Sequence, residues 1–215
     1  MLGLFQDEGD VLKSPRQEDA APGRFKYQDI NKDDTITVDD MTFIGNPNPK
    51  FTLGLNVGIN YKSFDFSAFF YGVFGNDVVN AIGMQNDILP LGGDAKRKTA
   101  LYNSWTPGST STKVPVPEVF LNWSNGFNPD SYSIEDGSYF RCKSMILGYT
   151  LPASFTKKIK ISKLRFYIQA TNLFTITKYS GLDPELSGST IYFGIDSGNY
   201  PSGQKQFLFG LNLNF

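Results

Sequence analysis

The segment from Asp29 to Asp40 carries oxygen-bearing side chains at the spacing of a calcium-binding loop. Such a loop takes side-chain oxygens from positions 1, 3, 5 and 12 and a backbone carbonyl from position 7. The residues in these positions are Asp29, Asn31, Asp33, Asp40 and, for the carbonyl, Thr35. Asp34 stands where glycine is usual, and Asp40 is shorter than the usual glutamate. The segment predicts either a structural calcium ion or a solvated acidic turn without metal.

Aromatic side chains in two long expected connections are the second candidate for a binding role. Indole and phenol rings stack on sugar rings and also pack against protein surfaces. The candidates for contact with a ligand or a covering partner are Trp105, Trp123, Tyr192 and Tyr200. Packing within its own loop is the alternative for each of them.

The composition removes most catalytic chemistry. The sequence has no histidine and a single cysteine, Cys142, which excludes Ser-His-Asp and Cys-His catalysis and an internal disulfide. The adjacent carboxylates Glu135-Asp136 and Asp39-Asp40 indicate turns, since neighbours in sequence rarely face each other across a scissile bond. We therefore predict that the chain is not an enzyme and holds no organic cofactor. A net charge of -1 offers no field for nucleic acid.

Five segments alternate apolar and polar residues with the period of two that strands require. They span 51–62, 64–74, 138–151, 164–177 and 205–215. The third segment changes phase, which requires a β-bulge near Lys143-Ser144. The connections alternate between short (62–63 and 152–163) and long (75–137 and 178–204). This alternation is typical of periplasmic turns and extracellular loops in an outer-membrane barrel.

Alternation alone fits two kinds of β-protein. The apolar faces would meet lipid in a barrel and a second sheet in a soluble sandwich. Glycine and asparagine on the polar faces favour a crowded barrel interior. Because about eight strands form the smallest closed barrel, five strands predict an incomplete one. The alternative is a secreted calcium-binding β-sandwich that acts as a carbohydrate-binding module.

Several short motifs together are specific to a known family. They are Gly45–Phe51, Glu135–Arg141, Leu147–Pro152, Asn172–Phe174, Lys178–Glu185 and Phe209–Phe215. In order and spacing they resemble the C-terminal part of the barrel of SusC/RagA-like TonB-dependent transporters of the Bacteroidetes outer membrane. The resemblance covers nearly the whole chain from Leu2 onward.

The resemblance implies an all-β fold, namely about five C-terminal antiparallel strands of a transmembrane barrel of about 22 strands with long extracellular loops. It implies import of oligosaccharides or other large nutrients, in some cases peptides, across the outer membrane. TonB and a SusD-like lipoprotein lid would be the partners of the full-length protein. It divides the chain into an irregular lead-in from a missing upstream barrel region (1–21), an extracellular segment with the calcium-loop-like turn (22–50), and barrel strands with extracellular loops (51–215).

Overall fold

The computed structural model describes residues 1–88, 97–110, 112–125, 130–156, 160–186, 192–198, 200 and 203–215. These residues form two compact units, each assembled from segments that are distant in sequence. The loop unit consists of Met1–Gly45, Val78–Glu135 and Ile195–Gly198, and the strand unit of Asn46–Asp77, Asp136–Gly194 and Asn199–Phe215. The chain therefore leaves the loop unit for a first hairpin and returns to it between later strands.

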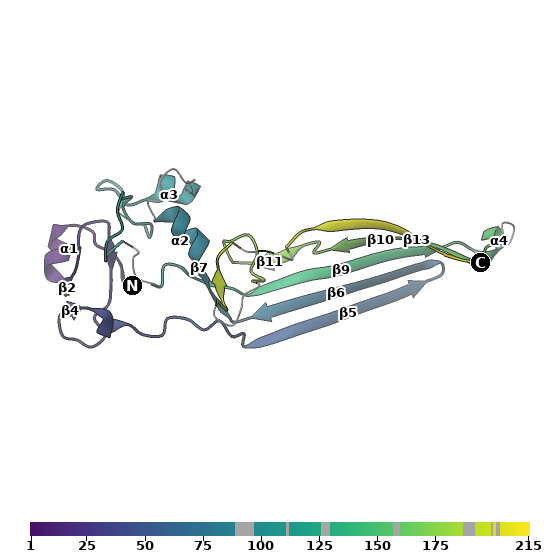
Figure 1. Ribbon diagram of the computed structural model, residues 1–215, viewed down its shortest axis with the longest axis horizontal. Helices are drawn as coiled ribbons and strands as arrows, with labels where there is room; N and C mark the ends of the chain where they lie inside the picture. Colours follow the sequence, from purple (N-terminus) through teal and green to yellow (C-terminus); the bar gives the residue numbers. More distant parts are fainter. Residues whose placement is uncertain are drawn as a thin grey trace. The chain divides into compact units, whose positions relative to one another are not determined.

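The strand unit is a single antiparallel sheet. Its long strands are β5 (Phe51–Tyr61), β6 (Phe64–Phe74), β9 (Tyr139–Thr150), β10 (Lys163–Thr171) and β13 (Gln206–Asn214). They lie side by side in the order β13-β10-β9-β6-β5 (Figure 1). Short β11 (Thr175–Thr177) pairs with β9, and helix α4 (Ala153–Thr156) lies in the connection between β9 and β10. The predicted all-β fold of about five antiparallel strands is confirmed.

The strand register separates the polar side chains from the apolar ones. One row across the sheet joins Tyr61, Phe64, Tyr149, Phe166 and Leu211. The adjacent row on the other face joins Asn60, Asp65, Gly148, Tyr167 and Gly210. Successive side chains of a strand point to opposite faces, so the rows alternate along the whole sheet. The sheet consequently has an apolar face and a polar face.

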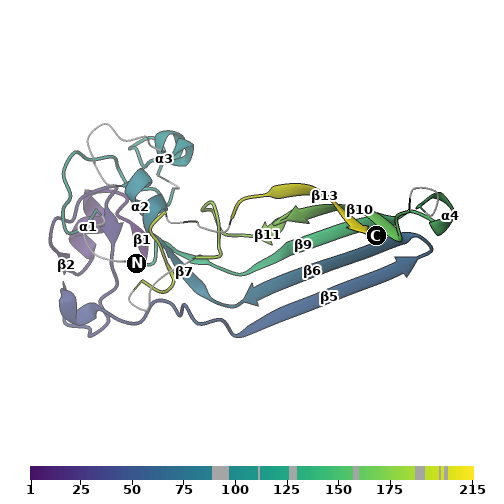
Figure 2. The same ribbon diagram turned by 45° about the vertical axis from the view of Figure 1, so that its right-hand side comes forward.

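The apolar face of the strand unit is uncovered among the described residues. Phe166 is 46% exposed, Leu211 54% and Phe209 77%. A sandwich buries such a face beneath a second sheet about 10 Å away, and the strand unit contains no second sheet in its described part. The hairpin of β5 and β6 in Figure 2 likewise lies in one layer with its neighbours.

A β-bulge interrupts the pairing of β6 with β9 at the predicted place. Phe69 pairs with Ser144 and Phe70 pairs with Cys142, which leaves Lys143 as the extra residue. The segment predicted as one strand, 164–177, is divided into β10 and β11. Its break begins at Asn172, whose φ of 51° lies in the left-handed region. The Asn172 amide donates to the Lys143 carbonyl, so the break follows the bulge in β9.

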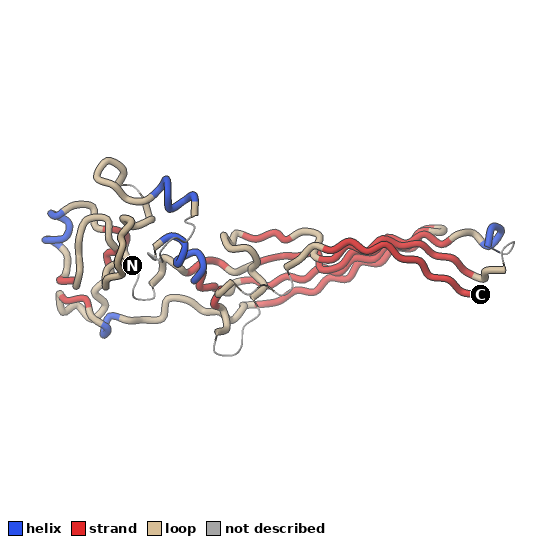
Figure 3. Tube along the Cα trace, turned by 45° about the horizontal axis from the view of Figure 1, so that its top comes forward, coloured by secondary structure: helices blue, strands red, loops and turns tan. Residues whose placement is uncertain are grey.

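The loop unit consists of short elements. They are β1 (Gly3–Leu4), α1 (Glu8–Lys13), β2 (Arg16–Gln17), β3 (Phe25–Lys26), β4 (Thr35–Ile36), the 3-10 turn η1 (Val38–Asp40), β7 (Asp77–Asn80), α2 (Ala81–Asp87), α3 (Lys98–Asn103), β8 (Ile134–Asp136) and β12 (Ile195–Asp196). The first residue of β7 and the last residue of β8 belong to the strand unit. Figure 3 shows helices in blue and strands in red. Of the helices in the described part of the chain, none has the length and apolar character needed to cross a membrane.

A small apolar core holds the loop unit together. Leu4, Phe25, Ile88 and Trp105 are buried against one another. Gly23 permits this packing, because its φ of 84° is left-handed and a Cβ there would lie 2.5 Å from the Trp105 ring. The core joins residues from the first strand to the connection after α3.

The first residues of the chain, expected to be irregular, form part of this unit. Leu4 pairs with Phe25 across β1 and β3, and helix α1 follows. The Asp7 carboxylate caps α1 by accepting the Asp10 amide at 2.7 Å. A six-residue helix with no buried residue carries no apolar periodicity, and this explains why the sequence pattern did not indicate it.

Candidate functional site

The predicted calcium loop adopts a compact turn held by its own carboxylates. Asp29 accepts backbone amides from Lys32 at 2.6 Å and Asp34 at 2.9 Å. Asp33 accepts the Thr35 amide at 2.9 Å, and the Asn31 side-chain oxygen accepts the Asp33 amide at 3.1 Å. Each predicted ligand other than Asp40 thus lies within one hydrogen-bonded turn.

Asp40 closes this turn. Its carboxylate accepts the amides of Thr37 at 2.8 Å and Ile30 at 2.7 Å, and these bonds, the Thr37 bond above all, hold the pKa of Asp40 below its ordinary value. Asp34 takes the left-handed conformation, with φ 61°, where glycine would be free of strain. Across the described residues, no group of three or more acidic, histidine or cysteine side chains is placed to hold a metal ion. The calcium ion stays a prediction.

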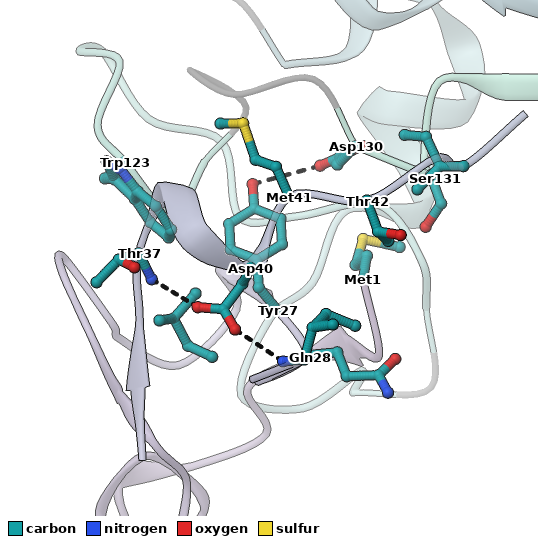
Figure 4. A pocket seen from close by; sticks show the side chains of 13 residues that line it. Met1, Tyr27, Gln28, Thr37, Asp40, Met41, Thr42, Trp123, Asp130 and Ser131 are labelled. Atoms are coloured by element: carbon teal, nitrogen blue, oxygen red, sulfur yellow. Dashed lines mark hydrogen bonds between the residues drawn. The ribbon is translucent and has the colours of Figure 1, made fainter. Parts of the chain in front are cut away.

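A cavity of about 350 Å³ opens beside this loop (Figure 4). It lies wholly within the loop unit and is formed by residues from three separate stretches of sequence. Its lining comprises Met1, Tyr27, Gln28, Ile30, Ile36, Thr37, Asp40, Met41, Thr42, Ile44, Trp123, Asp130 and Ser131. The volume is that of a small-molecule site.

Two carboxylates and two aromatic rings give this cavity its polar chemistry. Asp130 is 5% exposed, and burial raises its pKa. Tyr27 donates its hydroxyl to Asp130 at 3.4 Å, and burial followed by the charge of Asp130 raises the pKa of Tyr27. The Tyr27 ring meets the Trp123 ring edge-on at 5.3 Å. The cavity therefore combines negative charge with an apolar wall.

The four aromatic candidates occupy different environments. Trp105 is 7% exposed in the core of the loop unit, where its ring supports the fold and offers no face to a surface ligand. Trp123 lines the cavity. Tyr192 is 58% exposed, and Tyr200 is half-buried. The described structure brings none of the other three to the wall that Trp123 forms.

A charged network lies on β9, β11 and the segment that follows them. Arg141 donates to Asp183, to Glu185 at 2.7 Å and to the Thr175 hydroxyl at 2.8 Å. The Arg141 and Asp183 side chains are each 3% exposed. Lys143, the bulged residue, also pairs with Glu185. Two of the sequence motifs, Glu135–Arg141 and Lys178–Glu185, are therefore joined through these ion pairs.

A second ion pair crosses the polar face of the sheet. Arg165 of β10 donates to Asp65 of β6 at 2.8 Å and 2.5 Å. The guanidinium passes over Gly148 of β9, where a Cβ would lie 2.5 Å from the Asp65 Oδ1 atom. Glycine at 148 therefore leaves room for the close approach of these two side chains, and a Cβ there would displace their ends.

Sequence reasoning missed both the cavity and the ion pairs between strands. The cavity residues Tyr27 and Asp130 are far apart in sequence, and no short motif links them. The signal for the ion pairs was the presence of Arg141 and Lys143 in one strand and Arg165 in the next, because a charge within a mostly uncharged strand calls for a partner.

Comparison with known proteins identifies the fold. No protein-family model matches the chain. TonB-dependent receptor P3 of Formosa agariphila is 36% identical over 205 residues, which are 92% of this chain and 19% of that receptor. TonB-dependent receptor SusC of Bacteroides thetaiotaomicron is 29% identical over 215 residues, covering 100% of this chain and 20% of SusC.

Solved structures give the same result. The RagAB peptide importer in its open-open state superposes with a TM-score of 0.69 and 28% identity, over 99% of this chain and 21% of that one. A structure of the RagAB peptide transporter gives 0.67 and 30%, over 85% of this chain and 19% of that one. The chain spans about a fifth of the length of the relatives it matches.

The strands of the chain match a segment of a TonB-dependent receptor barrel. The resemblance that the motifs indicated is confirmed, and the chain is of the SusC/RagA-like kind.

Proposed function

We propose that the strand unit forms part of the wall of an outer-membrane importer driven through TonB. The observation that carries this proposal is the continuous apolar face of β5, β6, β9, β10 and β13, uncovered in the described structure. An antiparallel sheet with one apolar and one polar face suits a barrel whose outside meets lipid and whose inside does not. The names of the similar receptors support the same function.

The polar face suits the interior of such a barrel. Side chains there include glycine, asparagine and the paired charges of Asp65 and Arg165. A charge that faced lipid would cost about 2–4 kcal/mol at the bilayer midplane, whereas a pair on the inner face stays in contact with water or protein. The long connections then lie outside the cell and the short ones in the periplasm.

The cargo would be an oligosaccharide or a peptide. SusC and the RagAB peptide importer are both similar to this chain, and the peptide that RagAB imports supports a large nutrient rather than an ion. A SusD-like lipoprotein would cover the extracellular mouth, and TonB would supply energy from the periplasmic side. The function is transport without catalysis.

Uptake in living cells tests this proposal. A strain without the receptor that carries this chain, and the same strain complemented with it, would be given fluorescent oligosaccharides and fluorescent peptides of matched size. We expect complementation to restore uptake of one class and deletion of TonB to remove it. Equal uptake of both classes in all strains would refute the importer.

We also propose that the loop from Asp29 to Asp40 binds a structural calcium ion outside the cell. The donor types and the spacing support it. Calorimetric titration of the receptor with calcium tests it, beside an Asp29→Ala and Asp33→Ala double variant. We expect heat of binding from the parent and none from this site in the double variant. The same heat of binding from the parent and from the double variant would refute calcium binding by this loop.

A further inference from the structure

The connections at the two ends of the sheet differ in charge. The short segments 62–63 and 152–163 contain no aspartate or glutamate, and they carry Lys62, Lys157, Lys158, Lys160 and Lys163. In the long segments that leave the other end, 75–137 and 178–204, acidic residues outnumber basic ones. Residues 157 and 158 lie outside the described part of the chain. The end of the sheet with the short segments, here named the basic edge, thus carries one sign of charge.

The backbone brings both short segments to this edge. Figure 1 shows the turn between β5 and β6, helix α4 and the C-terminus at the same end of the sheet. The Thr150 amide, at the end of β9, donates to the Ser63 carbonyl at 2.8 Å. The Ser162 amide donates to the Asn214 carbonyl of β13, also at 2.8 Å. The lysines of both segments therefore lie along one edge of the same sheet.

The lysines of the basic edge are not neutralised by the protein. Lys62 and Lys160 are exposed, and within the described residues neither takes part in an ion pair. Asp65, the acidic residue closest in sequence to the β5–β6 turn, is already paired with Arg165 on the polar face. Both lysines take the left-handed conformation, with φ 54° and 57°, in which glycine or asparagine is less strained. Turn geometry does not account for lysine at these two positions, whereas an anionic partner does.

An aromatic row ends the apolar face beside the basic edge. Tyr61, Phe64 and Tyr149 are neighbours in this row, and they are 65%, 51% and 36% exposed. The Lys62 ammonium lies 5.3 Å from the centre of the Tyr61 ring. Tyrosine is enriched where hydrocarbon meets lipid headgroups, because its ring is apolar and its hydroxyl is polar. A tyrosine-rich row followed by unpaired cations is the sequence of chemistry that a lipid meets from its acyl chains to its phosphate.

We propose that the basic edge binds the anionic headgroups of phospholipids in the periplasmic leaflet of the membrane. The ammonium groups of Lys62 and Lys160 would contact lipid phosphates, while the rings of Tyr61 and Tyr149 lie among the first acyl carbons. One lysine near a membrane surface strengthens the binding of anionic lipid about fivefold. The inference rests on the proposed barrel wall and adds the class of lipid that the wall favours.

The test measures which lipid gathers at the β5–β6 turn of the complete receptor that carries this chain. Ser63→Cys, in a Cys142→Ala receptor, would be labelled with a fluorophore and reconstituted into phosphatidylcholine vesicles. A minor share of the lipid would carry a quencher, on phosphatidylglycerol in one sample and on phosphatidylcholine in the other. The two quencher lipids share their acyl chains and differ in headgroup charge. Glycerol phosphate added to the solution distinguishes a lipid site from a site for phosphate in general.

Lysine substitutions identify the groups responsible. The variants are Lys62→Gln, Lys160→Gln and the two together. Lys50→Gln/Lys205→Gln is the matched control, because it removes two exposed lysines next to the opposite ends of β5 and β13. The control lowers the total charge of the receptor by the same amount and leaves the basic edge intact.

We expect phosphatidylglycerol to be preferred over phosphatidylcholine at the turn of the parent receptor. Each single substitution should lower this preference about fivefold and the two together about 25-fold, and the control should leave it unchanged. Equal quenching by both lipids, or a preference that the double substitution does not lower, would overturn the proposal and leave the barrel wall standing. Loss of the preference on addition of glycerol phosphate would overturn the assignment to lipid. An absence of quenching by either lipid would contradict the barrel wall as well.

Discussion

Replacing Arg141 by methionine tests whether the buried ion pairs fasten the segment after β11 to the sheet. Arg141 and Asp183 are each 3% exposed, so Arg141→Met leaves the Asp183 carboxylate buried without its cation. Removing one partner of such a pair costs about 3–5 kcal/mol. The Oδ2 atom of Asp183 already has no hydrogen-bond partner among the described residues. Few hydrogen bonds would therefore remain to stabilise the buried carboxylate after Arg141 is removed.

Arg165→Met is the matched control. Arg165 and Asp65 also form an arginine–aspartate pair in the strand unit, but their side chains are 18% and 33% exposed. A pair with this access to water contributes at most about 1 kcal/mol. The double variant Arg141→Met/Asp183→Asn should recover about 1–3 kcal/mol of the loss, because a neutral amide is easier to bury than an unpaired carboxylate.

The assay is urea unfolding of the receptor in detergent micelles, followed by tryptophan fluorescence, with limited proteolysis of the segment that contains Asp183. We expect Arg141→Met alone to lower the free energy of unfolding by several kcal/mol and to open this segment to protease. Equal losses in the free energy of unfolding from Arg141→Met and Arg165→Met would contradict the claim that burial makes the loss of the Arg141–Asp183 pair costly. So would a double variant with Asp183→Asn that recovers no stability.

Three further predictions follow from single contacts. Gly148→Ala should cost up to about 1 kcal/mol in the same unfolding assay, the most that the Arg165–Asp65 pair contributes, because its Cβ would displace the ends of both side chains. Gly58→Ala, with nothing within 4 Å of its Cβ, should cost nothing or stabilise the sheet; equal effects of the two substitutions would contradict the contact. The hydrogen bond from Lys26 lowers the pKa of Asp10. This pair therefore stabilises the loop unit fully at a pH above the ordinary carboxyl pKa of about 4. The stabilisation is lost as the pH falls through the lowered pKa of Asp10. Lys26→Met should remove that part of the pH dependence of melting, and an unchanged profile would argue against it. Trp105→Ala should cost about 3–5 kcal/mol and speed hydrogen exchange at Phe25, while Trp123→Ala, at the cavity wall, should leave this exchange slow.

The strands could be predicted because their pattern is local. In 51–62 every second residue is apolar, and β5 begins at Phe51 as expected. The bulge could be placed because a phase change in the alternation has only one structural solution. The break at Asn172 could not, because it depends on the carbonyls of Lys143 and Cys142 in the neighbouring strand.

The sequence pattern did not indicate the loop unit, because the contacts that hold this unit together are not local. Its core uses single residues such as Leu4, Phe25 and Trp105, spaced without any period. The cavity likewise joins Tyr27 to Asp130, across about half the chain. Such sites arise from tertiary contacts between irregular segments, and composition or spacing does not indicate them. The calcium spacing was local and visible, and the turn it describes is present.

The most direct test of the barrel wall compares two neighbouring residues of β13. Leu211 pairs with Phe166 on the apolar face, and Asn212 pairs with Arg165 on the polar face. Leu211→Cys and Asn212→Cys, each in a Cys142→Ala receptor, would be labelled with an environment-sensitive fluorophore and reconstituted with lipids that carry a quencher in their acyl chains. We predict strong quenching at 211 and little at 212. Equal quenching at both positions, or stronger quenching at 212, would contradict the assignment of the apolar face to lipid.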